Sequence, residues 1–269
     1  MGGTMTYRER LAAAVAARGN LCVGIDPMPS VLDAWGVAHD VRGLETVARG
    51  IVEELGEHAA AFKPQSAFFE PFGAAGIAVL ERVLADIGQA GALSILDVKR
   101  GDIGSSMAGY AQAYLADDAP LASDAITVSP YLGVGSLLPA FELARATSRG
   151  IYVLARTSNP DGGHLQTATT PSGASVAQHV LDELTALNVE HDGLLGVVLG
   201  ATHKDLGCDP SGFNGSILAP GVGAQGATIA SLASVFQRAL PLVLPTASRQ
   251  IIGGGRQRLR ARLQELLSG

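Results

Sequence analysis

The chain has 269 residues, of which 47% are hydrophobic and 16% are charged, so it can bury a sizeable core and disorder is not expected. Its formal net charge is −6 and it contains no basic run, which argues against nucleic acid or an acidic membrane surface as a partner. It has no secretory signal and no apolar run of about 18 residues, so we expect a cytoplasmic protein.

Short apolar runs of β-type residues alternate along the chain with Ala- and Leu-rich segments of helical period. The predicted strands cover residues 21–26, 60–65, 93–99, 125–129, 151–158, 194–201, 217–222 and 242–246. The predicted helices cover residues 6–18, 43–59, 74–90, 104–117, 134–148, 173–188, 226–239 and 250–267. The chain begins with one helix, and every predicted strand but one is then followed by a helical segment. This pattern predicts a (β/α)8 TIM barrel.

The barrel is expected to form a single domain over residues 1–269, because no low-complexity linker divides the chain. The one break in the alternation is the segment 202–216, where Gly, Pro and Asn residues leave room for at most a turn of helix. An open doubly wound sheet is the alternative fold, but such sheets more often stop at about five to seven strands.

Charged residues at the ends of the first three predicted strands form one candidate site. In a (β/α)8 barrel, chemistry takes place at the carboxyl ends of the strands. The first strand ends at Asp26, the second passes through Lys63, and the third ends at Asp97 and Lys99. Asp97 and Lys99 are two residues apart, so both side chains are expected to leave one face of their strand. Because the three strands are neighbours, all four side chains are expected to converge on one mouth of the barrel.

These charges allow a structural and a functional interpretation. Opposite charges at the end of a buried strand are costly unless they pair with each other or with a ligand. A structural ion pair would explain a single Asp–x–Lys. Lysines and carboxylates that alternate around the functional rim of a barrel favour a binding or catalytic site.

The ends of the seventh and eighth predicted strands form a second candidate site. Barrels often bind phosphate there, through backbone N–H groups and a helix N-terminus. The segment 220–226 is a glycine-rich turn that contains Gly223 and Gln225 and enters the next predicted helix. Arg249 follows the eighth predicted strand, and the N–H groups of its guanidinium can donate to phosphate oxygens. The alternative interpretation is that Arg249 is a solvated residue. Arg256 is the rival phosphate ligand, but it falls further into the last predicted helix.

Signals for a metal or an organic cofactor are poor. The six histidines form no metal-binding pattern, and neither a serine nucleophile elbow nor a P-loop is present. The set Asp97, Lys99 and Asp102 could hold Mg²⁺ in principle, but an adjacent ammonium disfavours a cation. The residues therefore predict a phosphate-bearing substrate whose reacting end meets the lysine–aspartate cluster, with no metal and no cofactor. A lysine ammonium near a developing carbanion stabilises the charge and can donate a proton.

Three motifs together make the chain resemble the orotidine 5′-phosphate decarboxylase family, in its longer bacterial (type 2) branch. They are Phe62-Lys63-Pro64, Asp-Val-Lys-Arg-Gly-Asp-Ile-Gly at 97–104 and Ala-Pro-Gly-Val-Gly-Ala-Gln-Gly at 219–226, and the likeness extends from Gly24 to Arg249. The resemblance implies a homodimeric barrel with shared active sites. It also implies conversion of orotidine 5′-phosphate to UMP and CO₂ in pyrimidine synthesis, without metal or organic cofactor.

The resemblance assigns roles to the charged cluster. Lys99 would donate a proton to C6, and Asp97 would lie near the departing carboxylate. Asp102, at the start of the loop after the third strand, would come from the partner subunit and complete a charge network with Lys63. Ser106 would also reach across the dimer.

The resemblance also assigns residues that bind the rest of the substrate. Asp26 would hold ribose hydroxyls together with Lys63. Ser158 would contact the pyrimidine amide, Gln225 the phosphate and the base edge, and Arg249 the phosphate, with N–H donors from the turn around Gly223. The loop after the seventh strand is shorter than in many relatives, so the longer loop at 159–166 is expected to take over closure.

Two alternative functions stay open from the sequence. One is a Mg²⁺-dependent sugar-phosphate decarboxylase or synthase of the same barrel superfamily, which a chelator would silence. The other is a barrel that binds a phosphate ligand without catalysis. Against the second, every charged position of the cluster is occupied.

Overall fold

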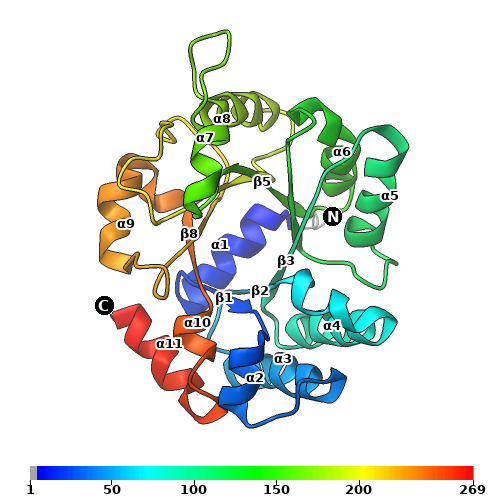
Figure 1. Cartoon of the computed structure of the whole chain (residues 1–269). Helices are drawn as coiled ribbons and strands as arrows, with labels where there is room; N and C mark the ends of the chain where they lie inside the picture. The colour runs from blue at the N-terminus through cyan, green and yellow to red at the C-terminus, as the bar shows by residue number, and fades with distance from the viewer. Residues whose placement is uncertain (1–4, 269) are drawn as a thin grey trace.

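The computed structural model describes residues 5–268 and forms a closed barrel of parallel strands that pair in chain order (Figure 1). The strands are β1 (Cys22–Ile25), β2 (Ala61–Pro64), β3 (Leu93–Arg100), β4 (Ala125–Val128), β5 (Gly150–Arg156), β6 (Leu195–Leu199), β7 (Ile217–Pro220) and β8 (Val243–Ala247). The predicted (β/α)8 barrel is therefore confirmed, and each predicted strand is present. The open-sheet alternative is excluded because β1 pairs with β8.

Helices cover the outside of the barrel and one crosses its base (Figure 1). The α-helices are α1 (Tyr7–Arg18), α2 (Pro29–Trp35), α3 (Val41–Leu55), α4 (Gly73–Gln89), α5 (Gly104–Leu115), α6 (Leu138–Ala146), α7 (Gly163–Gln166), α8 (Val176–Leu187), α9 (Ile229–Phe236), α10 (Arg249–Ile252) and α11 (Leu259–Ser268). Short 3-10 helices are η1 (Ser66–Phe68), η2 (Glu70–Phe72), η3 (Val134–Leu137), η4 (Pro160–Gly162), η5 (Gln237–Leu242) and η6 (Arg256–Arg258).

The predicted helices differ from the observed ones in a few places. The predicted helix at 250–267 is divided into α10, η6 and α11, because glycines at 253–255 interrupt it. α2 and α7 were not predicted; each is a short helix in a loop that follows a strand. The prediction for 202–216 is confirmed, since this segment contains turns but no helix. Within residues 5–268, no helix is long and apolar enough to cross a membrane.

The base of the barrel is closed by α1. Tyr7 is 3% exposed, and its hydroxyl lies 3.0 Å from that of Tyr152 inside the barrel. A Cβ on Gly150 would lie 2.3 Å from the Tyr7 ring, so only glycine allows the helix to approach this closely. Cys22 also faces this interior, and burial raises the pKa of its thiol to about 12. The thiol thus stays protonated and packs as a small apolar side chain.

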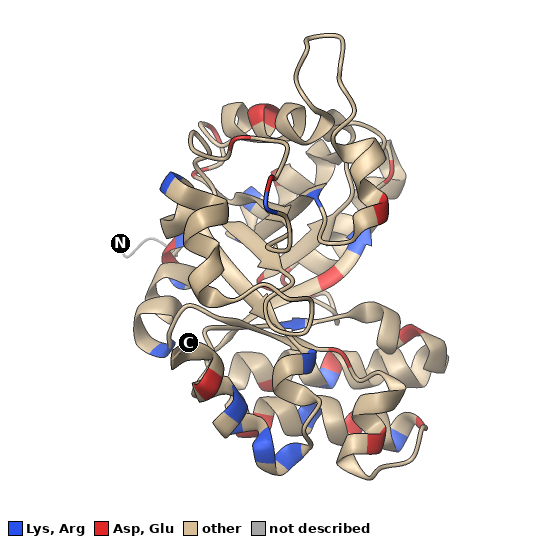
Figure 2. Ribbon diagram, turned by 60° about the vertical axis from the view of Figure 1, so that its left-hand side comes forward, with Lys and Arg blue, Asp and Glu red and all other residues tan. Residues whose placement is uncertain are grey.

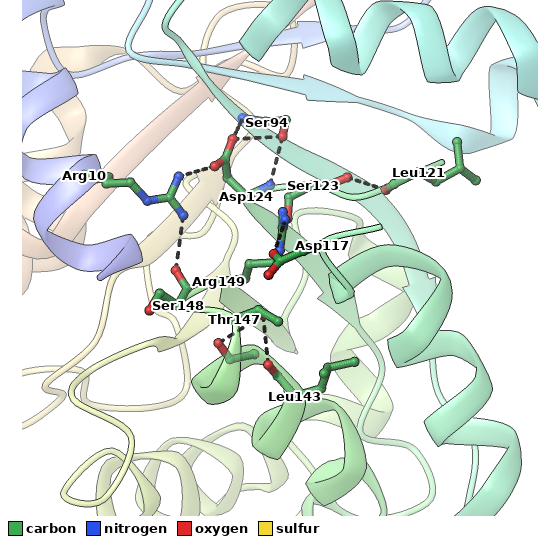
Figure 3. A network of polar contacts seen from close by, with 11 residues as sticks. Arg10, Ser94, Asp117, Leu121, Ser123, Asp124, Leu143, Thr147, Ser148 and Arg149 are labelled. Atoms are coloured by element: carbon green, nitrogen blue, oxygen red, sulfur yellow. Dashed lines mark hydrogen bonds and ion pairs between the residues drawn. The ribbon is translucent and has the colours of Figure 1, made fainter. Parts of the chain in front are cut away.

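A polar network fixes α1 to the starts of three strands (Figure 3). Arg10 forms an ion pair with Asp124 and donates to the carbonyl of Ser148, 3.1 Å away. Asp124 in turn accepts from the backbone N–H of Ser94 at 2.9 Å and from its hydroxyl at 3.0 Å. The helix is held at the amino ends of the strands, so the carboxyl ends remain open for a ligand.

Candidate active site

A cavity of about 400 Å³ opens at the carboxyl ends of the strands. This is where a (β/α)8 barrel places its functional residues. Most of the residues predicted from the sequence line it, namely Asp26, Lys63, Asp97, Lys99, Ser158, Gln225 and Arg249. The predicted convergence of the first three strands on one mouth of the barrel is therefore confirmed.

A larger hollow of about 710 Å³ lies outside the barrel, against α3, α4 and α11. Its charged side chains neutralise one another: Arg49 is 2.6 Å from Asp86, and Arg256 contacts Glu53 at 2.9 Å. Figure 2 shows basic and acidic residues interspersed over these outer helices instead of a surface of one sign. Arg256, the rival phosphate ligand, belongs to this surface and does not line the barrel cavity.

Asp97 is the centre of the polar network in the cavity. Its Oδ2 accepts from Lys63 Nζ at 2.7 Å and from Gln65 Nε2 at 3.0 Å. Its Oδ1 accepts from Lys99 Nζ at 2.6 Å and from the Thr127 hydroxyl at 2.7 Å. Each carboxylate oxygen thus accepts from one ammonium and one neutral donor, which fixes the orientation of the carboxylate.

The network keeps its charges although it is buried. Asp97 and Lys63 are only 6% and 7% exposed. Burial alone would raise the pKa of Asp97, but the ammonium groups of Lys63 and Lys99 reverse this and hold it well below its usual value. Burial would likewise lower the pKa of Lys63, but the charges of Asp97 and Asp26 outweigh it and leave that pKa above its usual value. The Lys99 side chain is 44% exposed and reaches into the open cavity.

The end of β3 departs from regular strand geometry. Leu96 pairs with Ile126 and Arg100 with Val128, so the three residues 97–99 lie opposite the single residue Thr127. Lys99 has a positive φ of 46°, which is rare for a residue with a side chain. Asp97 and Lys99 do meet, as predicted, but simple alternation along a strand is not the reason. The bulge turns the lysine back onto the aspartate.

Polar atoms without partners gather where β1 and β8 end. Asp26 Oδ1, Thr246 Oγ1 and Ser248 Oγ are buried and have no hydrogen-bond partner in the described part of the chain. Buried polar groups are almost always satisfied by protein, water or ligand. This side of the cavity is therefore suited to hydroxyl groups of a ligand.

The part of the cavity at the ends of β7 and β8 carries the predicted phosphate ligands. Gln225 and Arg249 line it, and within residues 5–268 the Arg249 guanidinium has no carboxylate partner. Gly223 does not line it: its N–H donates to the carbonyl of Ala227 at 2.8 Å. The glycine instead allows close packing, since a Cβ there would lie 2.6 Å from the Gln250 side chain.

The helix that follows the glycine-rich turn begins later than predicted. α9 starts at Ile229, and Thr228 and Ser231 form a capping box that satisfies its first N–H groups. The N–H groups at the N-terminus of α9 are therefore already bonded to side chains of the capping box. The short helix α10, which begins with Arg249, is the one whose first turn lies beside the cavity.

Asp102 and Ser106 lie outside the cavity of a single chain. Asp102 Oδ1 accepts from the N–H of Ile103 at 2.8 Å, and Ser106 is exposed on α5. Large apolar side chains are exposed nearby, with Ile103 63% and Tyr131 77% exposed. The single chain therefore does not bring these two residues to the charged cluster.

Sequence reasoning missed two residues that contact Asp97 directly. Gln65 lies two residues after Lys63, so strand alternation could have placed it on the same face. Thr127 lies in the middle of an apolar strand and gave no comparable signal. Thr157 and Asn159 also line the cavity, beside the predicted Ser158.

Comparison with known proteins gives a consistent result. The family model described as "Orotidine 5'-phosphate decarboxylase / HUMPS family" matches residues 19–254. The orotidine 5′-phosphate decarboxylase of Salinispora tropica is 53% identical over 252 residues, which cover 93% of this chain and 91% of that protein. That of Streptomyces coelicolor is 52% identical over 251 residues, with coverage of 93% and 90%.

Solved structures agree with these relatives. A crystal structure from Streptomyces avermitilis, described as a candidate orotidine 5′-phosphate decarboxylase, has a TM-score of 0.92 and 49% identity. The alignment covers 99% of this chain and 95% of that one. The likeness therefore extends over the whole barrel and its cavity.

Proposed function

The chain belongs to the orotidine 5′-phosphate decarboxylase family, and we propose that Lys63, Asp97 and Lys99 carry out the chemistry of that family in its barrel cavity. Its reaction is the decarboxylation of orotidine 5′-phosphate to UMP and CO₂, a step of pyrimidine synthesis. Neither the sugar-phosphate nor the non-catalytic alternative is favoured by the relatives at about 50% identity. A cytoplasmic location is part of the same proposal.

Lys99 is the proton donor in this proposal. When the bond between C6 and the carboxylate breaks, CO₂ leaves and the electron pair stays on C6. An N–H of the Lys99 ammonium then protonates C6, and the neutral amine regains a proton from solvent. The exposure of the Lys99 side chain within the cavity supports this role, because its ammonium can reach both substrate and water.

The fixed charges of the cluster lower the cost of this step. The carbanion at C6 has little delocalisation into the ring, so it depends on charge in its surroundings. Lys99 is already held 2.6 Å from Asp97, which Lys63 holds from the other side. An ammonium in a fixed position needs little reorganisation when negative charge appears beside it. This preorganised lysine–aspartate–lysine arrangement is the observation that carries the proposal.

The rest of the cavity would bind and orient the substrate. Asp26, with its unpartnered Oδ1, and Lys63 would hold the ribose hydroxyls. Gln225 and Arg249 would bind the phosphate, since loops after the seventh and eighth strands and a short extra helix commonly form phosphate sites in barrels. Ser158 would contact the pyrimidine amide, and the loop that contains η4 and α7 would close over it.

A second copy of the chain would complete the site. In this dimer, Asp102 and Ser106 of one subunit would enter the cavity of the other, as expected for a two-fold interface. The exposed side chains of Ile103, which follows Asp102, and of Tyr131 and Leu132, in the loop after β4, support the proposal because a dimer would bury them.

A direct assay tests the proposed function. Purified protein is mixed with orotidine 5′-phosphate, and loss of the substrate is followed by absorbance. We expect turnover by the wild type and almost none by Lys99→Ala. A wild type that binds UMP but leaves orotidine 5′-phosphate unchanged would contradict the proposal, and so would turnover that needs added metal.

A further inference from the structure

Thr127 fills a gap in the pairing of β3 with β4. The bulge at 97–99 separates the two strands locally, and their pairing resumes where the N–H of Ser129 donates to the carbonyl of Arg100 at 2.7 Å. The N–H of Lys99 falls in this gap, where residue 99 has no paired residue on β4. It donates to the Thr127 hydroxyl oxygen instead, at 3.0 Å.

The same hydroxyl also fixes Asp97. Its proton points to Asp97 Oδ1 at 2.7 Å, because a carboxylate can only accept. Its lone pairs remain free for the N–H of Lys99. One oxygen atom therefore contacts the backbone of the lysine and the carboxylate that orients the ammonium of that lysine.

This double contact occurs at a strained residue. Lys99 has a φ of 46°, a conformation that a residue with a side chain keeps only when its surroundings impose it. Thr127 is 1% exposed and β-branched, so its side chain has little freedom to move. The hydroxyl is thus a rigid acceptor at the point where the backbone needs one.

We propose that Thr127 is a positioning residue that holds the strained backbone of Lys99 and the carboxylate of Asp97 in register, so that the lysine ammonium faces the reacting carbon of the substrate. The inference rests on the proposed function, since it concerns the same lysine. Thr127 itself transfers no proton and binds no phosphate.

The test separates the hydroxyl from the packing of the side chain. Thr127→Val keeps the shape and removes the hydroxyl. Thr127→Ser and Thr127→Ala form a second pair, whose members differ only by the hydroxyl. Thr147→Val is the control, because it makes the same change at the base of the barrel, where the Thr147 hydroxyl donates to the carbonyl of Leu143 at 2.8 Å (Figure 3).

The variants are compared by kcat, KM for orotidine 5′-phosphate, Kd for UMP and thermal unfolding. We expect Thr127→Val to lower kcat by about tenfold to a hundredfold, as small misplacements of reacting groups do. KM and the Kd for UMP should change by less than about threefold, because the phosphate ligands are untouched. Thr127→Ser should retain most of the wild-type kcat. Thr127→Ala should lower kcat by about the same factor as Thr127→Val.

Three results would overturn the inference. They are a wild-type kcat in Thr127→Val, equal losses in the Ser and Ala variants, or a loss of kcat matched by Thr147→Val. If Thr127→Val does not fold, the Ser and Ala pair decides the question alone. An inactive wild type would instead contradict the proposed function, so the two failures can be told apart.

Discussion

Lys63 Nζ lies 2.7 Å from Asp97 Oδ2, and both side chains are almost completely buried. Taking two charges out of water is costly, and the pairing compensates for it only while both partners are present. The pair therefore links the catalytic cluster to the stability of the barrel.

Asp97→Ala should destabilise the protein by about 3–5 kcal/mol at neutral pH, because it leaves the Lys63 ammonium buried without its partner. The expected cost depends on pH. The pKa of Asp97 is lower in the folded protein than its usual value of about 3.9, so its charge stabilises the fold above that pH. This contribution is lost as the pH falls through and below about 4. Denaturant unfolding of wild type and variant between pH 3 and 7 measures it.

The matched control for that experiment is Asp118→Ala, which removes an exposed aspartate. Its effect should stay within about 0.5 kcal/mol at every pH. If the difference between wild type and Asp97→Ala were the same at acid and neutral pH, the charge of Asp97 would not be the stabilising factor.

Lys99→Ala should nearly abolish turnover while it leaves the fold and UMP binding intact. The ammonium is needed only where charge develops, so kcat should fall far more than affinity. Steady-state kinetics and UMP titration measure the two effects, with Lys204→Ala, outside the cavity, as the control. Retention of more than about a tenth of the wild-type kcat, a barrier change under roughly 1.4 kcal/mol, would remove Lys99 from the donor role.

Lys99→Ala and Asp102→Ala should each be inactive as separate preparations. Mixing the two kinds of subunit should restore activity. In the proposed dimer, each heterodimer contains one site with both residues intact. Activity is assayed after subunit exchange, which is followed independently with differently tagged chains. Proven exchange without recovered activity would contradict the shared site.

Arg249→Ala should lower kcat/KM for orotidine 5′-phosphate by about a hundredfold or more, because a charge-assisted contact to phosphate is lost. Turnover of the phosphate-free nucleoside should barely change. Arg256→Ala serves as the control, since Arg256 is paired with Glu53 and Glu54 outside the cavity. Equal losses on both substrates would show that Arg249 supports structure instead of phosphate binding.

Dialysis against EDTA should leave the activity unchanged. Among residues 5–268, no group of three or more His, Cys, Asp and Glu side chains is placed to hold a metal ion. The carboxylate of Asp97 is already occupied by two ammonium groups. A large loss that Mg²⁺ restores would favour the sugar-phosphate alternative.

The hydrophobic periodicity of the sequence was sufficient to predict the barrel fold and the position of the site at the carboxyl ends of its strands. All the strands and the convergence of Asp26, Lys63, Asp97 and Lys99 follow from the alternation of apolar runs. α2 and α7 were missed because short helices in loops have too few turns to show a period.

The contacts within the site were less predictable. The positive φ of Lys99 and the place of Thr127 depend on how two strands shift against each other, which no local pattern encodes. The N–H of Gly223 was expected to contact phosphate, but it donates to the carbonyl of Ala227 within the turn. The roles of Asp102 and Ser106 depend on a second chain, so a single chain leaves them as predictions.

The contact of Tyr7 with Gly150 makes α1 the floor of the barrel. The helix is therefore part of the folding unit and is not an appendage that could be trimmed. Removing it would expose the apolar barrel interior around Tyr152 to water. For protein engineering, the consequence is that a fusion partner attached before Thr6 would leave from the closed end of the barrel, while the opposite end stays free to exchange substrate and product.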